Sequence, residues 1–367
     1  MSLGVGVLGC GRVFTGPYAE MIERLRGRVH VAAVYDVDED KRRAAAARYG
    51  VDPELAGPDA LLALDDVEIV LVLTSMNEHG PLAREALAAG KHVMVEKPMA
   101  TLLDEAAELV ELARTSPGLL VCAPHIVLSP TFRAIHDAVR AGAVGDVLSA
   151  RARYGWRGPS WGEWFYRPGG GSLFDLGIYN VTALCALFGP ARRVTAMTGV
   201  AVPERVVDGR TIRVEADDTA HVLLDFGDSR FAVVTTGFII QKYRSPPIEV
   251  YGSEGTVQML GDDWAPEGWE LWRNEERCWR VYRESDPHWH WTDGLRHLVD
   301  CVESGRPTIT RPEQAYHALE IMLAAQAAGA DGVARPIESD FPAPVYDEPA
   351  EVAAAQTVHD PRTADEL

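Results

Sequence analysis

The first 122 residues alternate short apolar runs with helical stretches, and this alternation constrains the fold more than any other feature of the chain. Apolar strands separated by helices of such lengths form βαβ units around a parallel sheet. We therefore expect an α/β domain at residues 1–122. The strands are expected at 4–8, 29–35, 69–73, 92–95 and 119–123, and the helices at 16–26, 41–49, 81–89 and 103–114.

A different pattern begins near residue 123, where the strands become longer and alternate apolar with polar residues. Such alternation is typical of a large open sheet, antiparallel or mixed, with one face on a core. We expect an α+β domain at 123–337 and then an acidic tail at 338–367, rich in proline and alanine, that is exposed or loosely docked. The strands are expected at 147–154, 192–197, 219–226, 231–240, 249–251 and 256–260, and the helices at 131–141, 294–304 and 312–328.

Charge and cysteine usage limit the partners and the compartment. The chain has 54 acidic and 35 basic residues, a net charge of −19, which argues against nucleic acid or an anionic membrane as a partner. The five cysteines are scattered without a C-x-x-C pair, and no basic leader precedes the first strand. No apolar run reaches the roughly 18 residues that a membrane span needs. We expect a cytoplasmic protein that acts on small molecules.

One segment raises the question of a metal site. His288 and His290 would point to the same side of an extended strand. No acid or cysteine stands at ligand spacing beside them, so we expect these histidines to line a pocket or to pack, and we expect no metal.

Gly9-x-Gly11 follows the first strand and precedes a helix, which is the setting of a dinucleotide-binding turn. Gly9 permits the tight turn, and Gly11, with Arg12 and Val13 after it, lets the backbone approach a pyrophosphate at the helix N-terminus. Phe14 occupies the position where a third small residue is usual. The pattern predicts a Rossmann domain.

Asp36 ends the second strand and indicates which dinucleotide is bound. A carboxylate there can accept hydrogen bonds from the adenosine ribose hydroxyls and would repel a 2′-phosphate, which favours NAD over NADP. The alternative for Asp36 is a cap for the helix that begins near Lys41. Arg12, Lys41 and Arg42 are close enough in sequence to leave NADP open.

Five segments together carry a resemblance to a known family. They are 5–12 (VGVLGCGR), 86–98 (ALAAGKHVMVEKP), 141–147 (AGAVGDV), 169–179 (GGGSLFDLGIY) and 250–256 (VYGSEGT). From Gly4 to about Val333 the chain resembles the Gfo/Idh/MocA family of sugar and polyol oxidoreductases. The resemblance implies a Rossmann domain followed by a substrate domain whose open sheet often faces another subunit, so a homodimer or homotetramer is expected.

Lys97, Asp175 and Tyr179 are the predicted catalytic residues. Asp175 and Tyr179 are four residues apart on the first turns of an expected helix and so share a face, and Lys97 ends the fourth strand. The resemblance implies that Lys97 contacts the substrate hydroxyl and the nicotinamide, that Asp175 orients the substrate or Lys97, and that Tyr179, where many members have histidine, is the general base. The Lys97 ammonium would lower the pKa of that phenol. The alternatives are a core tyrosine and a helix N-terminal charge.

The resemblance also assigns cofactor contacts. Glu96 matches a glutamate beside the lysine, and Thr74 and His79 match a loop along the cofactor, although Ser75 and Met76 depart from the usual Pro-Asn. The expected cofactor-binding residues are Gly9, Gly11, Arg12, Val13, Asp36, Thr74, His79, Glu96 and Lys97. Thr182 replaces an acid of inositol dehydrogenases, which argues against inositol as the substrate.

Residues 154–167 combine aromatic side chains with two arginines, and we expect them to recognise the substrate. Aromatic faces suit sugar rings, and an arginine suits a carboxylate or a phosphate. Trp164, Tyr166 and Arg167 are the expected contacts, with His125 after the strand at 119–123. The alternatives are a hydrophobic lid or interdomain packing for the segment, and a buried structural role for His125.

These features predict an NAD-dependent dehydrogenase or reductase. It would transfer hydride between the nicotinamide and a secondary or anomeric hydroxyl, or carbonyl, of a sugar, polyol or related diol. Two alternatives come from other classes: an NAD-dependent glycoside hydrolase, which releases an aglycone without net NADH, and a non-catalytic dinucleotide-binding regulator. The complete set of Lys97, Asp175 and Tyr179 argues against the regulator.

Overall fold

The computed structural model describes residues 2–52, 54–262, 264–283, 289–350, 352 and 354–360. The chain forms two compact units, one of Met1–His125 with Thr292–Leu319 and one of Ile126–Trp291 with Glu320–Leu367. Each unit therefore combines two separate stretches of the sequence.

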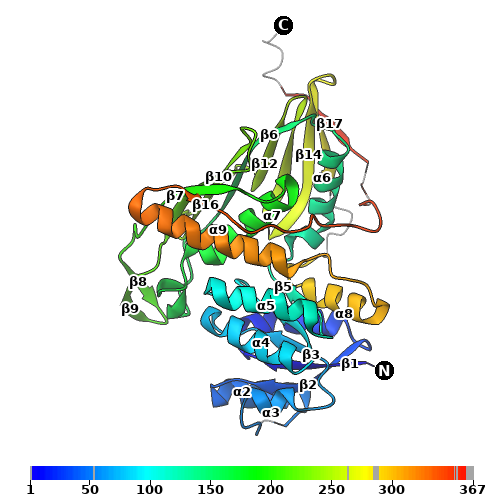
Figure 1. The fold of residues 1–367 in the computed structure, drawn as a ribbon, viewed down its shortest axis with the longest axis vertical. Helices are drawn as coiled ribbons and strands as arrows, with labels where there is room; N and C mark the ends of the chain where they lie inside the picture. The colour runs from blue at the N-terminus through cyan, green and yellow to red at the C-terminus, as the bar shows by residue number, and fades with distance from the viewer. Residues whose placement is uncertain are drawn as a thin grey trace. The chain divides into compact units, whose positions relative to one another are not determined.

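The first unit is built on a five-stranded parallel sheet with the order β2-β1-β3-β4-β5 (Figure 1). Strand β3 is buried along its whole length, as a strand covered on both faces must be. This sheet confirms the predicted α/β fold of the N-terminal region. The strands are β1 (Leu3–Leu8), β2 (Val29–Tyr35), β3 (Ile69–Val72), β4 (His92–Val95) and β5 (Leu120–Cys122).

Helices from both stretches cover this sheet. Helix α8 (Gly294–Ser304) comes from the second stretch and contacts β4 and β5. Helix α9 (Pro312–Asp331) begins in this unit and ends in the other. The remaining helices are α1 (Ala19–Arg24), α2 (Glu39–Tyr49), α3 (Pro58–Leu62), α4 (His79–Ala88) and α5 (Leu103–Thr115). Helix α3 is absent from the sequence prediction.

The second unit is built on a ten-stranded sheet with the order β16-β7-β10-β11-β6-β12-β13-β14-β15-β17. Strands β6 and β11 run parallel, and the other pairs are antiparallel, which confirms the predicted large mixed sheet. The strands are β6 (Val147–Gly155), β7 (Arg193–Gly199), β10 (Thr219–Asp225), β11 (Phe231–Gly237), β12 (Ile248–Gly252), β13 (Gly255–Asp262), β14 (Ala265–Arg273), β15 (Cys278–Arg283), β16 (Arg335–Pro336) and β17 (Gln356–Val358).

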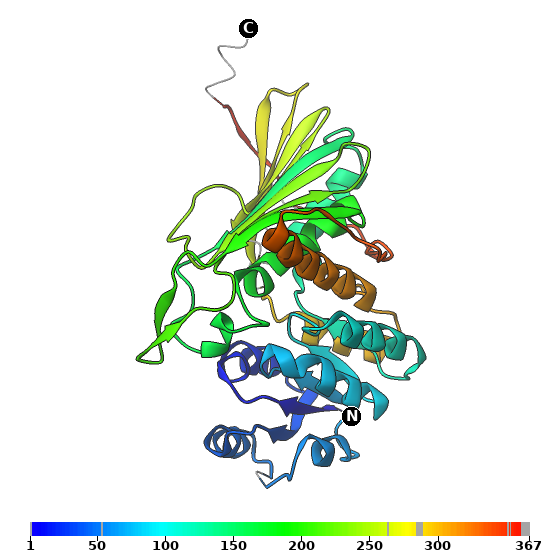
Figure 2. The ribbon, with the colours of Figure 1, turned by 60° about the vertical axis from the view of Figure 1, so that its left-hand side comes forward.

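The two faces of this sheet differ. Helices α6 (Pro130–Arg140) and α7 (Ile178–Phe188) contact strands of one face (Figure 2). On the opposite face Leu223, Phe231 and Val233 are each about two-fifths exposed, and Met197 is 79% exposed. Leu223 and Val233 are direct partners across β10 and β11, so the exposed apolar side chains are neighbours.

The segment after α9 is more firmly attached than the sequence suggests. The hydroxyl of Tyr346 donates to the carbonyl oxygen of Val127 (2.7 Å), and the Arg133 guanidinium lies over the Tyr346 ring, 5.0 Å from its centroid. Arg133 also donates to the carbonyl oxygen of Glu348 (2.8 Å). These contacts attach Tyr346 and the Glu348 carbonyl beside α6, while the exposed or loosely docked tail as a whole stays a prediction.

Candidate active site

The two glycines of the dinucleotide turn are needed for different reasons. Gly9 has φ +101°, and a Cβ there would lie 2.6 Å from the carbonyl oxygen of Leu73. A Cβ on Gly11 would meet no atom within 4 Å. The protein itself therefore requires the first glycine, whereas the backbone at the second lies open to a ligand. Arg12 and Val13 follow on the exposed side of the turn.

Phe14, at the position where a third small residue is usual, is buried in a π turn (η1, Phe14–Tyr18). Its ring centroid lies 5.6 Å from that of Tyr49 on α2. A π turn is wider than a turn of α-helix and is frequent at functional sites. The wider turn and the contact with α2 accommodate a side chain that would crowd a regular dinucleotide turn.

Asp36 holds the glycine turn through its carboxylate. The backbone N–H of Cys10 donates to Oδ2 (2.7 Å), and that of Asp38 donates to Oδ1 (2.8 Å). The cap of α2 is Asp38, whose side chain accepts from the N–H groups of Asp40 and Lys41, so the capping alternative for Asp36 is wrong. Asp36 is half-buried, and each of its oxygens can accept a further hydrogen bond.

Two of the three cations that leave NADP open, Lys41 and Arg42, have protein partners that bear on the ribose position. Lys41 Nζ lies 2.9 Å from an oxygen of Asp38, which raises the pKa of Lys41. Arg42 Nη1 donates to the carbonyl oxygen of Asp36 (3.0 Å). Neither side chain stands uncompensated beside the ribose position, which agrees with the preference of Asp36 for NAD.

Glu96 holds the backbone at Lys97 in place. The Tyr18 hydroxyl donates to Oε1 of Glu96 (2.7 Å), and the Lys97 N–H donates to Oε2 (3.1 Å). Glu96 is 7% exposed and Lys97 is half-buried. The Lys97–Pro98 peptide bond is cis. Tyr18 is a contributor that the sequence does not reveal, because its partner lies 78 positions further along the chain.

His79, at the start of α4, bridges the ends of β3 and β4. Its Nδ1 lies 2.8 Å from the carbonyl oxygen of Pro98, and its Nε2 lies 3.1 Å from that of Thr74. Burial lowers the pKa of His79, so the ring is neutral and donates to one carbonyl at a time. His79 therefore braces the loop at Thr74, itself half-exposed, against the Lys97–Pro98 bond.

Asp175 and Tyr179 lie at the start of α7 in the second unit. A second π turn (η5, Leu173–Gly177) carries Asp175 and leads directly into α7. Asp175 is 8% exposed and Tyr179 is 7% exposed. The Tyr179 ring meets that of Tyr154 edge-on, with centroids 5.6 Å apart. A nearly buried carboxylate and phenol on consecutive turns are groups suited to orienting a substrate and moving a proton.

The three expected substrate contacts of segment 154–167 have different surroundings. Trp164 is 39% exposed and stacks on Phe165, with centroids 3.7 Å apart. Tyr166 is 1% exposed, and its hydroxyl donates to the carbonyl oxygen of Pro159 (2.7 Å). The side chain of Arg167 binds two carboxylates, those of Glu163 and Glu215. Of the three, Trp164 is the side chain with a free aromatic surface.

His125 is a buried, neutral histidine of the first unit. It is 1% exposed, and neither ring nitrogen has a hydrogen-bond partner among the described residues. The ring lies against Gly294 of α8, where a Cβ would be 2.1 Å from Nε2. Burial, with a smaller contribution from His297, lowers the pKa of His125 to about 3. These surroundings agree with the alternative interpretation, in which His125 has a buried structural role and does not contact the substrate.

Two absences hold for the residues that the structure describes. None of their groups of three or more His, Cys, Asp or Glu side chains could hold a metal ion, and His288 lies outside them. None of the helices they form has the length and apolar character of a membrane span.

Comparisons with known proteins agree with this geometry. The family model described as "Oxidoreductase family, NAD-binding Rossmann fold" matches residues 3–123, and that of the "GFO/IDH/MocA C-terminal domain" matches 132–258. The trans-1,2-dihydrobenzene-1,2-diol dehydrogenase of Macaca fascicularis is 30% identical over 274 residues, 72% of this chain and 77% of that protein.

Two other similar proteins are a reductase of a dideoxy sugar nucleotide and a protein of gentamicin A biosynthesis. The dTDP-3,4-didehydro-2,6-dideoxy-alpha-D-glucose 3-reductase of Streptomyces violaceoruber is 33% identical over 198 residues, 53% of this chain and 56% of that protein. The structure of GenD2 from gentamicin A biosynthesis, in complex with NAD, is 30% identical with a TM-score of 0.75 and covers 92% of this chain and 97% of that one.

The parallel sheet with its glycine turn and the family models that match both parts of the chain define an NAD-binding oxidoreductase. More specifically, the chain belongs to the GFO/IDH/MocA family. The family, the fold class and the enzyme class predicted from the sequence are thereby confirmed.

Proposed function

We propose that this enzyme transfers hydride between NAD and a secondary or anomeric hydroxyl, or carbonyl, of a neutral sugar, polyol or cyclic diol. The observation that carries the proposal is the buried Asp175 and Tyr179 pair at the start of α7, in a chain whose relatives are named diol and sugar oxidoreductases. NAD would be held by Gly9, Gly11 and Asp36, and it supplies the hydride acceptor when bound.

The chain's own residues handle the proton. Tyr179 takes the proton of the substrate hydroxyl during oxidation and returns it during reduction. Asp175, four residues before Tyr179, orients the substrate hydroxyl, and Lys97 of the first unit contacts the nicotinamide region. Glu96, through its bond with the Lys97 N–H, keeps the lysine backbone in place.

A neutral substrate is favoured by the charge compensation of two arginines beside the aromatic segment. Arg167 is bound by two carboxylates and Arg205 by Asp218 at 3.0 Å, whereas Arg157 is exposed. Trp164 offers an aromatic face to a ring. Uncharged rings with adjacent hydroxyls fit these surroundings best.

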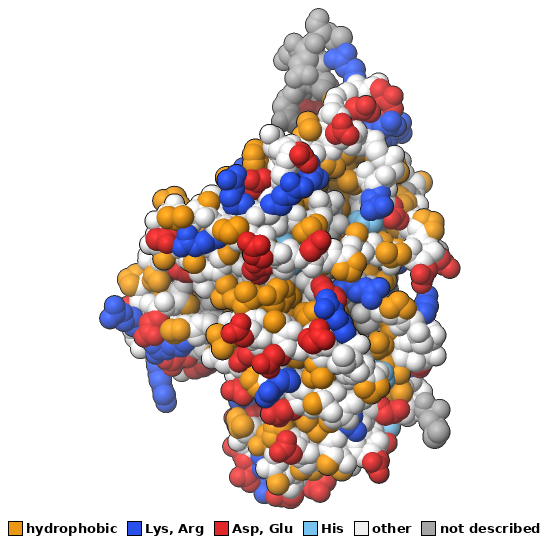
Figure 3. All heavy atoms as spheres, in the orientation of Figure 1, with side chains coloured by type: hydrophobic (Ala, Val, Ile, Leu, Met, Phe, Trp, Pro, Cys, Tyr) orange, Lys and Arg blue, Asp and Glu red, His pale blue; other side chains and the backbone are white. Residues whose placement is uncertain are grey.

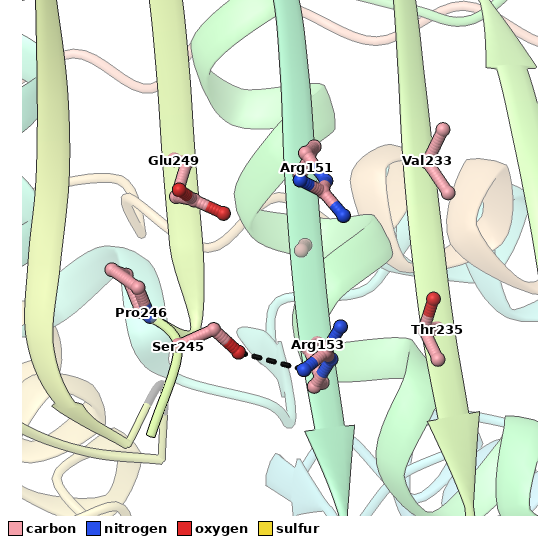
Figure 4. Close-up of a pocket in the computed structure, with 8 residues that line it drawn as sticks. Arg151, Arg153, Val233, Thr235, Ser245, Pro246 and Glu249 are labelled. Carbon is pink, nitrogen blue, oxygen red and sulfur yellow. Dashed lines mark hydrogen bonds between the residues drawn. The ribbon is translucent and has the colours of Figure 1, made fainter. Parts of the chain in front are cut away.

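We also propose a homodimer or homotetramer formed through the open face of the ten-stranded sheet. Besides its exposed apolar side chains, this face has a hollow of about 130 Å³ over β6 (Figure 4). Arg151, Arg153 and Glu249 line it, and Arg153 Nη1 donates to Ser245 Oγ (2.7 Å). A face that carries both signs of charge can pair with a copy of itself about a two-fold axis.

A cytoplasmic location and the absence of a nucleic-acid partner complete the proposal. All five cysteines are free and buried, as is usual in a reducing compartment. Basic side chains are interspersed with acidic ones on the face drawn in Figure 3, without the continuous basic stripe that nucleic acid selects.

The test is a titration of the purified protein with NAD, NADH, NADP and NADPH by tryptophan fluorescence, followed by assays at the reduced-nicotinamide absorbance band. The substrate panel contains neutral sugars, polyols and cyclic trans-diols beside sugar acids and sugar phosphates. We expect tight NAD(H) binding and turnover of neutral compounds. Failure to bind any dinucleotide overturns the proposal. Aglycone release without net NADH would indicate a glycoside hydrolase, and binding without turnover would indicate a regulator.

A further inference from the structure

Arg205 lies outside every set of residues predicted from the sequence, yet it joins three parts of the second unit. It belongs to a two-stranded hairpin, β8 (Glu204–Val207) and β9 (Arg210–Arg213), that stands apart from the large sheet. The side chain is 13% exposed. Nη2 donates to Asp218 Oδ2 and to the carbonyl oxygen of Phe238 (both 3.0 Å), and Nη1 donates to that of Arg157 (2.8 Å).

Asp218 is the anionic partner of Arg205 and is fully buried. Its Oδ1 accepts from the N–H of Ala201 (2.7 Å), and its Oδ2 accepts from that of Val202 (3.0 Å). A buried carboxylate needs such donors and a positive partner, because an unpaired buried charge is strongly unfavourable. Asp218 thus ties the chain after β7 to the Arg205 guanidinium.

Tyr166 lies on the other side of the guanidinium. The Arg205 Cζ is 5.3 Å from the centroid of the Tyr166 ring, within the range of a cation–π contact. The Tyr166 carbonyl oxygen accepts from the N–H groups of Glu215 (2.9 Å) and Ala216 (3.1 Å). Together with the bond to the Arg157 carbonyl, these contacts hold the aromatic segment 156–167 near both of its ends.

The same segment is joined to the start of α7. The Gly171 N–H donates to the carbonyl oxygen of Phe165 (2.8 Å), and the Asp175 N–H donates to that of Gly171 (3.0 Å). Gly171 has φ +101°, and a Cβ there would lie 2.9 Å from the carbonyl oxygen of Asp217. Asp217 in turn precedes Asp218. The backbone that carries Asp175 is therefore continuous, through short hydrogen bonds, with the segment that Arg205 holds.

We propose that Arg205 is a positioning residue that, through Asp218 and Tyr166, holds the aromatic segment 156–167 against the start of α7 and so sets the affinity for the ring substrate. The inference rests on the proposed function. NAD binds through residues of the other unit, so loss of the Arg205 guanidinium raises the substrate KM and leaves NAD affinity unchanged.

Two variants separate charge from geometry. Arg205→Lys keeps a positive charge opposite Asp218 but lacks the planar fork that reaches two carbonyls at once. Tyr166→Phe removes the hydroxyl that donates to Pro159 and keeps the ring. Arg210→Ala, an exposed arginine on the same hairpin, is the matched control.

We expect Arg205→Lys to raise KM about 10- to 100-fold with kcat within about threefold, Tyr166→Phe to raise KM about threefold, and Arg210→Ala to change neither. Arg205→Ala, where it folds, should recover affinity when guanidinium chloride is added at millimolar concentration. An unchanged KM in Arg205→Lys overturns the proposal. Equal losses of kcat, KM and NAD affinity also overturn it, because they indicate a general structural role.

Amide hydrogen exchange of residues 156–172 gives a readout that needs no turnover. Exchange there should be faster in Arg205→Lys than in the wild type or in Arg210→Ala, with β1–β5 unaffected. Should the wild type bind no dinucleotide, the proposed function fails, and the exchange result still decides whether Arg205 orders the segment. Unchanged exchange in Arg205→Lys overturns the inference on its own.

Discussion

The dinucleotide turn of the first unit and the aromatic segment of the second both lie beside the start of a helix, but different interactions hold them. The turn depends mainly on backbone conformation, through the positive φ of Gly9, and on one carboxylate, that of Asp36 on the Cys10 N–H. The aromatic segment depends on side chains from distant positions, Arg205 and Asp218. A site held by its backbone conformation is sensitive to substitution of its glycines. A site held by side chains is sensitive to substitution of one ion pair.

The largest effect is expected at the helix next to the aromatic segment. Tyr179→Phe removes only the phenol oxygen, so we expect kcat to fall about 10²- to 10⁴-fold because the proposed general base is lost. NAD affinity and the melting temperature should stay close to wild type. Steady-state kinetics and a thermal melt measure both. Tyr154→Phe, which changes the ring that meets Tyr179, should lose less than about tenfold. A fully active Tyr179→Phe would mean that another group takes the proton.

The two glycines of the turn should respond differently to the same methyl group. Gly9→Ala forces a side chain into a left-handed conformation and against the Leu73 carbonyl, so we expect about 2–4 kcal/mol lower stability and no NAD binding. Gly11→Ala fits the protein but occupies the approach to the pyrophosphate, so NAD should bind about 10- to 100-fold more weakly at an unchanged melting temperature. Equal melting temperatures for the two variants would contradict this explanation.

Acid should destabilise the first unit through its buried histidines. Burial lowers the pKa of His125 to about 3 and that of His297 to about 4, and it also lowers that of His79. The unfolded chain takes up protons near its ordinary pKa of about 6.5, so stability is complete above about pH 7 and falls as the pH drops from about 6.5 toward 4.

The urea midpoint of unfolding, measured between pH 5 and 8, tests this dependence. His125→Leu should reduce the slope of the midpoint against pH, even if the absolute midpoint also shifts. His359→Asn, at an exposed position, should leave the slope unchanged. If the slope is the same in His125→Leu as in the wild type, groups other than His125 cause the acid sensitivity.

The smallest effect on turnover is expected at the open face of the sheet. Val233→Glu places a charge among the exposed side chains of β10 and β11, so we expect light scattering to show a shift from dimer or tetramer toward monomer. The kcat should change less than about threefold, because the substituted face is the one opposite α7. A monomeric wild-type protein would remove the basis for the proposed oligomer.

The sequence predicts the parts of the molecule that depend on local pattern. The five parallel strands are apolar runs of the right length, and Gly9, Gly11 and Asp36 stand at fixed distances from strand ends. Strands β14 and β15 escape prediction because Glu267, Glu270 and Arg280 interrupt their apolar residues. In the fold, Trp269 and Tyr282 of these strands stack at 4.2 Å, a contact that exists only after pairing.

The parts that escape prediction depend on tertiary proximity. Nothing in the local sequence pattern distinguishes Arg205 from Arg210 or Arg213. What sets Arg205 apart is its burial beside Asp218, which exists only in the folded chain. The π turns at Phe14–Tyr18 and Leu173–Gly177 likewise have no local signature of their own, although Gly16, Pro17 and Gly177 are poor helix formers. The sequence therefore predicts which residues form the site better than it predicts the tertiary contacts that hold those residues in place.

The division of the first unit between Met1–His125 and Thr292–Leu319 has a consequence for synthesis on the ribosome. The sheet is translated first, but α8, which contacts β4 and β5, emerges only after the long stretch that forms most of the second unit. At ordinary elongation rates of about 5–20 residues per second, that interval lasts roughly ten to forty seconds. During that time the nascent sheet is not covered by α8, and a chaperone can bind its exposed apolar surface.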